Sequence, residues 1–215
     1  DLHSFPTRRS SDLNAACARQ ALAGWREVGD KRGESASLKY LGYAYFEQHR
    51  LDEASTCYRQ GLALSREIGW RYGEAGTLNA LGLCQQRLGR FDEAIAFHEQ
   101  ARAINRELGN HLGEPSALNN LGWAYHRSEQ HERAIAAYLD ALTMTREVGF
   151  RYQEAEILWG LGQVHHALGR NDQARTCWEH SISILHDIGA LTADEADSLR
   201  AQPIPRTPEM IERNT

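Results

Sequence analysis

One eight-residue pattern returns every forty residues along this chain of 215 residues. Each copy starts with a leucine and has a leucine and a glycine three and four residues later; the copies start at Leu38, Leu78, Leu118 and Leu158. A fixed period of this size is typical of solenoids, in which each unit is too small to bury its apolar face alone and stacks on its neighbours. The repeat therefore predicts a stack of similar units.

Further positions recur with the same period downstream of each copy. They hold alanine, then an aromatic residue or histidine, then a small residue: Ala54, Ala94, Ala134 and Ala174; Tyr58, His98, Tyr138 and Trp178; Gly61, Ala101, Ala141 and Ser181. Each unit ends on a glycine: Gly29, Gly69, Gly109, Gly149 and Gly189.

The combined spacing, Leu-x2-Leu-Gly-x2-aromatic and then Ala-x3-aromatic-x2-small, resembles the tetratricopeptide repeat. The resemblance covers about residues 14–189 and implies an all-α, right-handed superhelical α-solenoid of antiparallel helix pairs. Two features depart from the family pattern: the period exceeds the usual value of roughly 34 residues, and glycine rather than proline closes each unit. The interval from Gly42 to Ala54 matches the family, so we expect the extra residues to lie at helix ends.

The repeat divides the chain into an array over residues 14–202 and flanking segments. We predict a partial repeat and four full repeats, then a capping helix: residues 14–29; 33–69, 73–109, 113–149 and 153–189; and 192–201. The partial repeat matches a second helix whose first helix is missing, so we expect it to carry an uncovered face.

Each full repeat is predicted to be a helix pair, with boundaries good to a few residues. The first helices are expected over residues 33–48, 73–88, 113–128 and 153–168, and the second over residues 52–68, 92–108, 132–148 and 172–188. Acidic residues near the second-helix starts and arginines near their ends suit the helix dipole: Asp52, Asp92 and Asp172; Arg26, Arg66, Arg106 and Arg146. We therefore interpret the repeated Arg-Glu-aliphatic-Gly as a helix-ending signal whose glycine is left-handed. The glycine of each Leu-Gly pair is expected to let the alanine-bearing helix approach closely.

The two ends of the chain break the pattern. Residues 1–13 lack an initiator methionine and back-translate to a sequence that resembles a short-read sequencing adapter, so we interpret them as a non-native artefact joined to a truncated gene. Thr192 and Glu195 have the capping-box spacing. Pro203, Pro205 and Pro208 oppose regular structure, so we expect residues 203–215 to form a loose tail or the start of a linker.

Most function classes find no support in the residues. The formal net charge of -5 argues against direct contact with nucleic acid, and the sequence contains no apolar run long enough to span a membrane. Three of the four cysteines, Cys17, Cys57 and Cys177, share one repeat position with Phe97 and Ala137, which indicates packing rather than metal binding. No phosphate loop, nucleophile elbow or metalloprotease motif is present. We therefore expect no enzyme, no cofactor and no metal, and we expect a reducing, cytoplasmic compartment.

The resemblance also implies a binding surface, because the first helices of this family line a concave groove that binds peptides. Its contact positions fall in this chain on the following residues: Lys39, Tyr43, Phe46, Asn79, Leu83, Gln86, Asn119, Asn120, Trp123, His126, Trp159, Gln163 and His166. Carboxamides can pair with any peptide backbone and aromatic side chains supply anchoring area. Equally, Tyr43, Trp123 and Trp159 could cover seams between helices, since such residues are often half-buried.

Two hypotheses on function follow from these patterns. In the first, the chain is an interaction module for a peptide, a protein or another domain of the same parent chain. The 40-residue period resembles the repeat tails of large bacterial transcriptional regulators, which implies a role in signal transduction or transcription regulation. In the second, the array is a structural spacer or a self-association scaffold with no external ligand.

Overall fold

The fold is a repeat of helix pairs. The computed structural model describes residues 8–208 and 211, and within them it has ten α-helices and no strand. The chain is therefore an all-α repeat protein of the solenoid class, as the period predicts. Its contacts divide it into two compact units, Asp1–Gly109 and Asn110–Thr215, and this division follows the glycine that ends one repeat.

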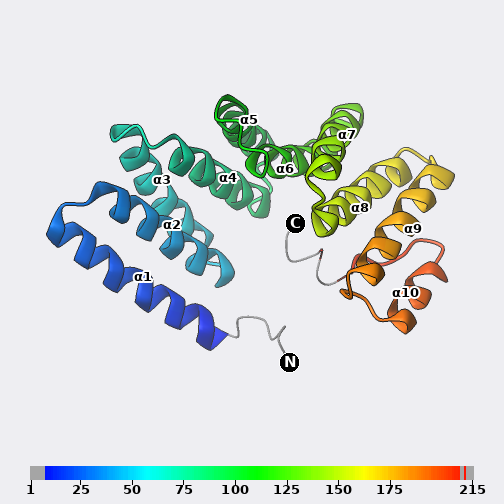
Figure 1. Ribbon diagram of the computed structural model, residues 1–215, viewed down its shortest axis with the longest axis horizontal. Helices are drawn as coiled ribbons and strands as arrows, with labels where there is room; N and C mark the ends of the chain where they lie inside the picture. The colour runs from blue at the N-terminus through cyan, green and yellow to red at the C-terminus, as the bar shows by residue number, and fades with distance from the viewer. Residues whose placement is uncertain (1–7, 209–210, 212–215) are drawn as a thin grey trace. The chain divides into compact units, whose positions relative to one another are not determined.

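Unit 1 contains five helices in which each packs on the next (Figure 1). They are α1 (Arg8–Val28), α2 (Lys31–Glu47), α3 (Leu51–Glu67), α4 (Arg71–Arg87) and α5 (Phe91–Glu107). The first helices α2 and α4 also contact each other.

Unit 2 contains the other five helices and follows the same scheme. They are α6 (Gly113–Arg127), α7 (His131–Val148), α8 (Arg151–Ala167), α9 (Asn171–Asp187) and α10 (Ala193–Arg200). The eight paired helices begin and end within two residues of the predicted limits. At α10 the predicted capping box is confirmed, because Thr192 and Glu195 bond each other reciprocally.

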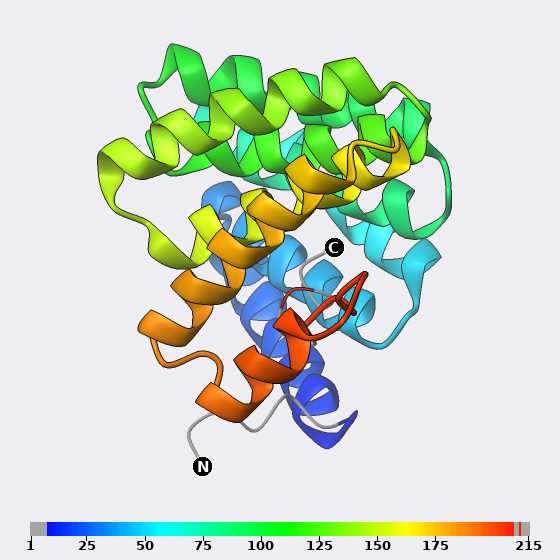
Figure 2. The same ribbon diagram turned by 90° about the vertical axis from the view of Figure 1, so that its right-hand side faces the viewer.

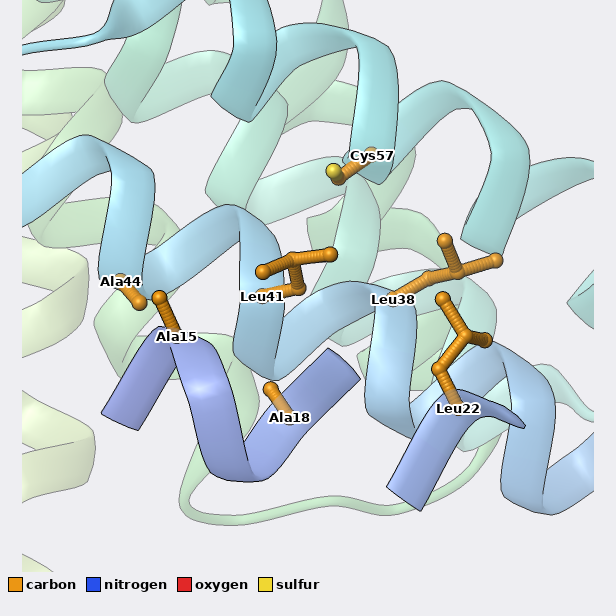
Figure 3. Packing of buried hydrophobic residues seen from close by; sticks show 7 residues of the cluster. All are labelled: Ala15, Ala18, Leu22, Leu38, Leu41, Ala44 and Cys57. Atoms are coloured by element: carbon orange, nitrogen blue, oxygen red, sulfur yellow. The ribbon is translucent and has the colours of Figure 1, made fainter. Parts of the chain in front are cut away.

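The helix α1 begins at Arg8, so it runs through part of the segment interpreted as non-native. Figure 3 shows Ala15 and Leu22 pointing from α1 toward α2, where Leu38 and Leu41 complete a buried cluster. Ser11 is also buried, and Gln48 donates a hydrogen bond of 3.0 Å to Asp12. Residues 11 and 12 therefore take part in the fold of unit 1, whatever their origin; residues 1–7 lie outside the described residues.

The glycine of each Leu-Gly pair faces an aromatic ring of the alanine-bearing helix. A β-carbon built on Gly42 would lie 2.5 Å from the ring of Tyr58, and one built on Gly82 would lie 2.4 Å from the ring of His98. Gly122 and Gly162 face Tyr138 and Trp178 in the same way. The alanine-bearing helix therefore approaches closely, and the atoms nearest to the glycine belong to the larger side chain four residues after the alanine, which reaches across the helix pair.

The glycines that end each repeat take the predicted left-handed conformation, for example Gly149 with φ 76°. A second left-handed position lies at the end of each first helix, where Gly89 and Gly169 stand in two repeats. The other two repeats place His49 and Glu129 there, with φ 59° and 62°. Side chains disfavour this region, so these two turns carry a backbone cost that the glycine turns avoid.

The arginine of the Arg-Glu-aliphatic-Gly motif lies in the last helical turn as predicted, and it also has a specific partner. Arg66 Nε lies 2.9 Å from Glu74 Oε1, and Arg146 Nε lies 2.8 Å from Glu154 Oε1. Arg26 and Glu34 pair in the same way. Each pair joins the end of one helix pair to the start of the next, which the capping interpretation did not anticipate.

Candidate functional site

In unit 1 the predicted contact positions lie along α2 and α4. Tyr43 is exposed, and Lys39 and Phe46 are half-buried on α2. On α4, Asn79 and Leu83 are half-buried, whereas Gln86 is only 4% exposed. Because a ligand cannot reach a buried side chain without rearrangement, Gln86 is not available on this surface in the structure.

A cavity of about 660 Å³ opens beside Lys39 and Tyr43. The remaining lining residues come from α1, α2, α3 and α4: Asn14, Cys17, Ala18, Ala21, Tyr40, Tyr58 and Ala80. The lining is predominantly apolar, and the volume of the cavity lies within the range of ligand pockets. The sequence pattern identified two of the nine lining residues, Lys39 and Tyr43, as contact positions.

Among the described residues no first helix covers the outer face of α1, and this leaves the cavity open on that side. Asn14 and Ala21 are exposed, and Trp25 is 42% exposed. Their equivalents in the four complete pairs are all buried: Ala54, Ala94, Ala134 and Ala174; Gly61, Ala101, Ala141 and Ser181; Ser65, Asn105, Thr145 and Leu185. The uncovered face predicted for the partial repeat is therefore confirmed, and it could have identified the α1 lining residues from sequence.

The polar groups at this cavity are few. Burial lowers the pKa of Lys39, and its ammonium lies 5.6 Å from the centre of the Tyr40 ring. Burial, then the charge of Glu47 and a hydrogen bond to it, raises the pKa of Tyr43. Within the described part of the chain Lys39 forms no ion pair, so the cavity combines an apolar wall with one partly desolvated cation.

The carboxamide of Asn79 has a structural partner. Its Oδ1 lies 2.8 Å from Nδ1 of His98, a fully buried ring. Burial lowers the pKa of His98 to about 3, so the ring is neutral and its Nδ1–H donates to Asn79. Asn79 therefore satisfies a core histidine, a role that the groove interpretation did not include.

In unit 2 four of the predicted contact positions lie along α6. Asn119, Asn120, Trp123 and His126 are all half-buried. The guanidinium of Arg127 lies 5.7 Å from the centre of the Trp123 ring. Burial, then the charges of His131 and Arg127, lowers the pKa of His126 to about 4, so this surface is polar and aromatic but its histidine is uncharged at neutral pH.

The contact positions on α8 are arranged differently. Gln163 and His166 are half-buried, but Trp159 is only 2% exposed. Its ring lies 6.2 Å from that of Trp178, and its indole N–H donates a hydrogen bond of 3.3 Å to Thr207 Oγ1. Trp159 therefore contacts the segment that follows α10.

That segment was expected to be loose, and the structure corrects this. Residues 201–208 contain no helix, as the prolines predict. Pro205, Pro208 and Ile211 are nevertheless buried, and Pro203 and Pro205 line a small space against Trp178 and Ile182 of α9. In Figures 1 and 2 the red segment after α10 turns back along α9.

The described residues also bear on metal sites, disulfides and membrane-spanning helices. No group of three histidine, cysteine or acidic side chains there could hold a metal ion. The four cysteines are free thiols. Over the same residues, no helix is long and apolar enough to cross a membrane.

Comparison with protein families finds the same family in three parts of the chain. Models of the tetratricopeptide repeat match residues 35–68, 73–147 and 155–180. No curated protein matches the chain by sequence.

Solved structures share the fold at low sequence identity. BtubC (BKLC) from P. vanneervenii is 21% identical over 87% of this chain and 78% of its own, with a TM-score of 0.74. Aspartyl phosphate phosphatase F from Bacillus subtilis is 15% identical over 86% of this chain and 49% of its own, with a TM-score of 0.75. A signal transduction ATPase with a tetratricopeptide repeat sensor, from Pyrococcus horikoshii, is 18% identical over 80% of this chain and 27% of its own, with a TM-score of 0.70. At these identities the likeness concerns the fold alone.

Proposed function

Because the chain belongs to the tetratricopeptide repeat family, we propose that it is a protein-interaction module that binds a polypeptide segment on the surface of its first helices. The observation that carries the proposal is the cavity of about 660 Å³ in unit 1. It is an apolar surface beside an exposed tyrosine, and such surfaces mark interaction sites more often than bulk surface does.

The contents of the cavity wall suggest the partner. On α1, Asn14 and Ala21 occupy positions that a helix covers in every complete pair, so an apolar polypeptide face fits there. Tyr43 is 52% exposed at the edge and can supply anchoring area. Lys39 favours a partner that carries a negative charge beside its apolar face.

Unit 2 supports the same proposal through α6. Asn119, Trp123 and His126 are spaced four and then three residues apart, so they lie on one face of the helix. A carboxamide and a large aromatic residue on one face can bind a peptide backbone and anchor one of its side chains.

We further propose that the partner is a peptide, a separate protein or another domain of a longer parent chain, in a signalling or transcriptional regulator. The similarity to the repeat sensor of the Pyrococcus ATPase supports this parentage. Scaffolds of this family are generally non-enzymatic, and fold likeness alone does not transfer an activity; the phosphatase name therefore belongs to its own protein.

The test begins with capture of a partner on the immobilised chain and measurement of its affinity by calorimetry. Tyr43→Ala should weaken binding by about 1 to 3 kcal/mol, as expected for an interface hot spot. Tyr72→Ala is the matched control, because Tyr72 is 56% exposed in the same unit but does not line the cavity.

The same comparison is made in unit 2. Asn119→Ala and Trp123→Ala should each weaken binding by about 1 to 3 kcal/mol, whereas the control Glu99→Lys, on the second helix α5 of unit 1, should change it little. If Glu99→Lys abolishes binding and the first-helix changes do not, the partner uses the second helices and the proposed surface is wrong.

A second candidate function is self-association, and the exposed face of α1 favours it. Trp25 is 42% exposed and Val28 is 71% exposed there. Light scattering on the chain and on Trp25→Glu distinguishes the candidates: a dimer that dissociates in the variant supports self-association through α1, and a monomer in both excludes it.

A further inference from the structure

The segment after α10 makes contacts with two helices of unit 2. Thr207 accepts the indole hydrogen bond of Trp159 on α8. Pro203 and Pro205 face the side of α9 that carries Arg175, Trp178 and Ile182. The segment thus covers a surface made of one first helix and one second helix.

This surface contains a position that is only half-buried in the other repeats. Lys39, Asn79 and Asn119 are equivalent to Trp159, and each of them is half-buried. Trp159 is 2% exposed, and the segment is one of the elements that cover it. A tryptophan at this position suits the segment that covers it, because an indole offers a large apolar ring and a single N–H donor.

The segment has the properties of a ligand rather than of a further helix. Its prolines at 203, 205 and 208 lack a backbone N–H and fix φ, so the segment loses little conformational freedom when it becomes ordered. Its described hydrogen bonds are local: Arg206 N–H donates to Gln202 Oε1, Ile211 N–H donates to the carbonyl of Pro208, and Gln202 donates to the carbonyls of Leu199 and Ser198 at the end of α10. Apolar contact and one indole hydrogen bond of 3.3 Å are its described attachments to α8 and α9.

We propose that Trp159 and the adjoining face of α9 form a docking surface for an extended, proline-containing segment, and that this chain's own residues 202–208 occupy it in cis. A partner segment of the same chemistry binds only when the chain's own segment leaves. The required features are an apolar proline at the position of Pro205 and a hydroxyl acceptor at the position of Thr207.

This inference deepens the proposed function, because Trp159 is one of the predicted contact residues. The two proposals fail separately. Unchanged partner binding in Tyr43→Ala and Trp123→Ala would contradict the proposed first-helix surface, whereas the experiment below uses only the chain and a peptide copy of its own segment.

The probe is a synthetic peptide of residues 202–211 with an amino-terminal fluorophore, and its binding is measured by fluorescence anisotropy. The full chain is compared with the full-length double variant Pro205→Asp/Pro208→Asp, which places charges at two buried positions and releases the segment. The matched control is Ile204→Asp, since Ile204 lies in the same segment but is 54% exposed.

The released variant should bind the peptide at least about tenfold more tightly than the parent chain does, because a segment held in cis competes at a high effective concentration. Ile204→Asp should bind it as the parent does. Equal binding by all three proteins, or no binding by the released variant, overturns the proposal.

A double-mutant cycle locates the contact. In the released variant, Trp159→Phe keeps an aromatic ring but removes the N–H donor, and a Thr207→Val peptide removes the acceptor. Each change should weaken binding several-fold, and the two together should weaken it no more than either alone. Independent effects that multiply would show that Trp159 does not contact the peptide at Thr207.

Folding is checked by circular dichroism on every variant. If the released variant loses its helical signal, the segment is an integral part of unit 2 and the proposal of a displaceable ligand is wrong. The milder variant Pro205→Ser then gives a second measurement, in which peptide binding no tighter than that of the parent chain leads to the same conclusion.

Discussion

The helices α1 in unit 1 and α9 in unit 2 carry the same second-helix pattern but differ in what covers them. In α9, Ser181 and Leu185 are completely buried against the rest of unit 2. Their equivalents in α1 are Ala21 and Trp25, and both are exposed. The difference shows that exposure depends on the neighbouring helix rather than on the repeat position itself.

The first-helix surfaces differ in a parallel way. Lys39 and Tyr43 line an open cavity in unit 1, whereas Trp159 in unit 2 lies beneath the segment that follows α10. The same family position is therefore available on α2, at Lys39, and covered on α8, at Trp159. This contrast between an open and a covered surface can be tested by substitution.

The largest expected effect comes from removing a side chain at one repeat position in both units. Leu185→Ala should cost about 2 to 5 kcal/mol of unfolding free energy, because it leaves a cavity in a packed core. Trp25→Ala at the equivalent position should cost less, since part of that ring is already in water. Chemical denaturation measures both; a larger loss for Trp25→Ala would contradict the view that the face of α1 that carries Trp25 is uncovered.

A second pair of substitutions tests what the two units share. Glu74 and Glu154 are 8% and 6% exposed, and each accepts hydrogen bonds from two arginines. Glu74→Gln and Glu154→Gln should each destabilise by about 1.5 to 3 kcal/mol, the range for hydrogen bonds to charged groups. Similar losses would show that the joints between repeats are alike, so the difference between the units lies in their surfaces.

The pH dependence of the unfolding free energy tests the contribution of Glu74 to the contact between repeats. Burial would raise the pKa of Glu74, but hydrogen bonds from Arg66 and Arg71 outweigh it, and the pKa lies below its ordinary value. Its contribution is therefore present above the unfolded pKa and is lost as the pH falls through the lowered folded pKa. In Glu74→Gln this part of the acid dependence should disappear.

The third prediction concerns the buried ring at one repeat position, His98 in unit 1 and Tyr138 in unit 2. Burial holds the pKa of His98 at about 3, so the unfolded chain binds a proton at higher pH than the folded chain does. Stability should therefore fall below about pH 6.5, by roughly 1 to 2 kcal/mol between pH 6.5 and 5 from this residue. His98→Phe should remove that part of the slope; Tyr138→Phe is the control and should leave the slope unchanged.

The smallest effect is expected at the turns between helices of a pair. His49 and Glu129 have left-handed backbones where the other two repeats have glycine. His49→Gly and Glu129→Gly remove the steric cost in the folded chain but add freedom to the unfolded chain, so each should change the melting temperature by only a few degrees at most. If either variant loses more than about 1 kcal/mol of unfolding free energy, the replaced side chain makes stabilising contacts in its unit.

The sequence predicted the periodic features well, because they depend on residues close together in the chain. The helix pairs, the Thr192 capping box and the left-handed glycines follow from local spacing and backbone geometry. The cavity face of α1 was also predictable, since the partial repeat has a second-helix pattern with no first helix before it.

The remaining features depend on which side chain meets which position across helices. The pattern could not show that Asn79 bonds His98, that Gln86 is buried, or that Thr207 reaches Trp159, because none of these contacts recurs with the period. The three prolines predicted the absence of a helix, but proline spacing alone does not show whether a segment packs on the protein. The prediction of individual contact residues therefore remains the part to be tested.

Site-specific ¹⁹F NMR of the chain labelled with 5-fluorotryptophan tests the open and covered surfaces most directly, because each tryptophan gives its own signal. The account predicts that the signal of Trp25 responds strongly to solvent isotope exchange and that the signal of Trp159 does not. In Pro205→Asp/Pro208→Asp the Trp159 signal should become responsive while that of Trp25 stays unchanged. A Trp159 signal that responds fully in the parent chain, or stays protected in the variant, would contradict the claim that the chain's own segment covers this surface.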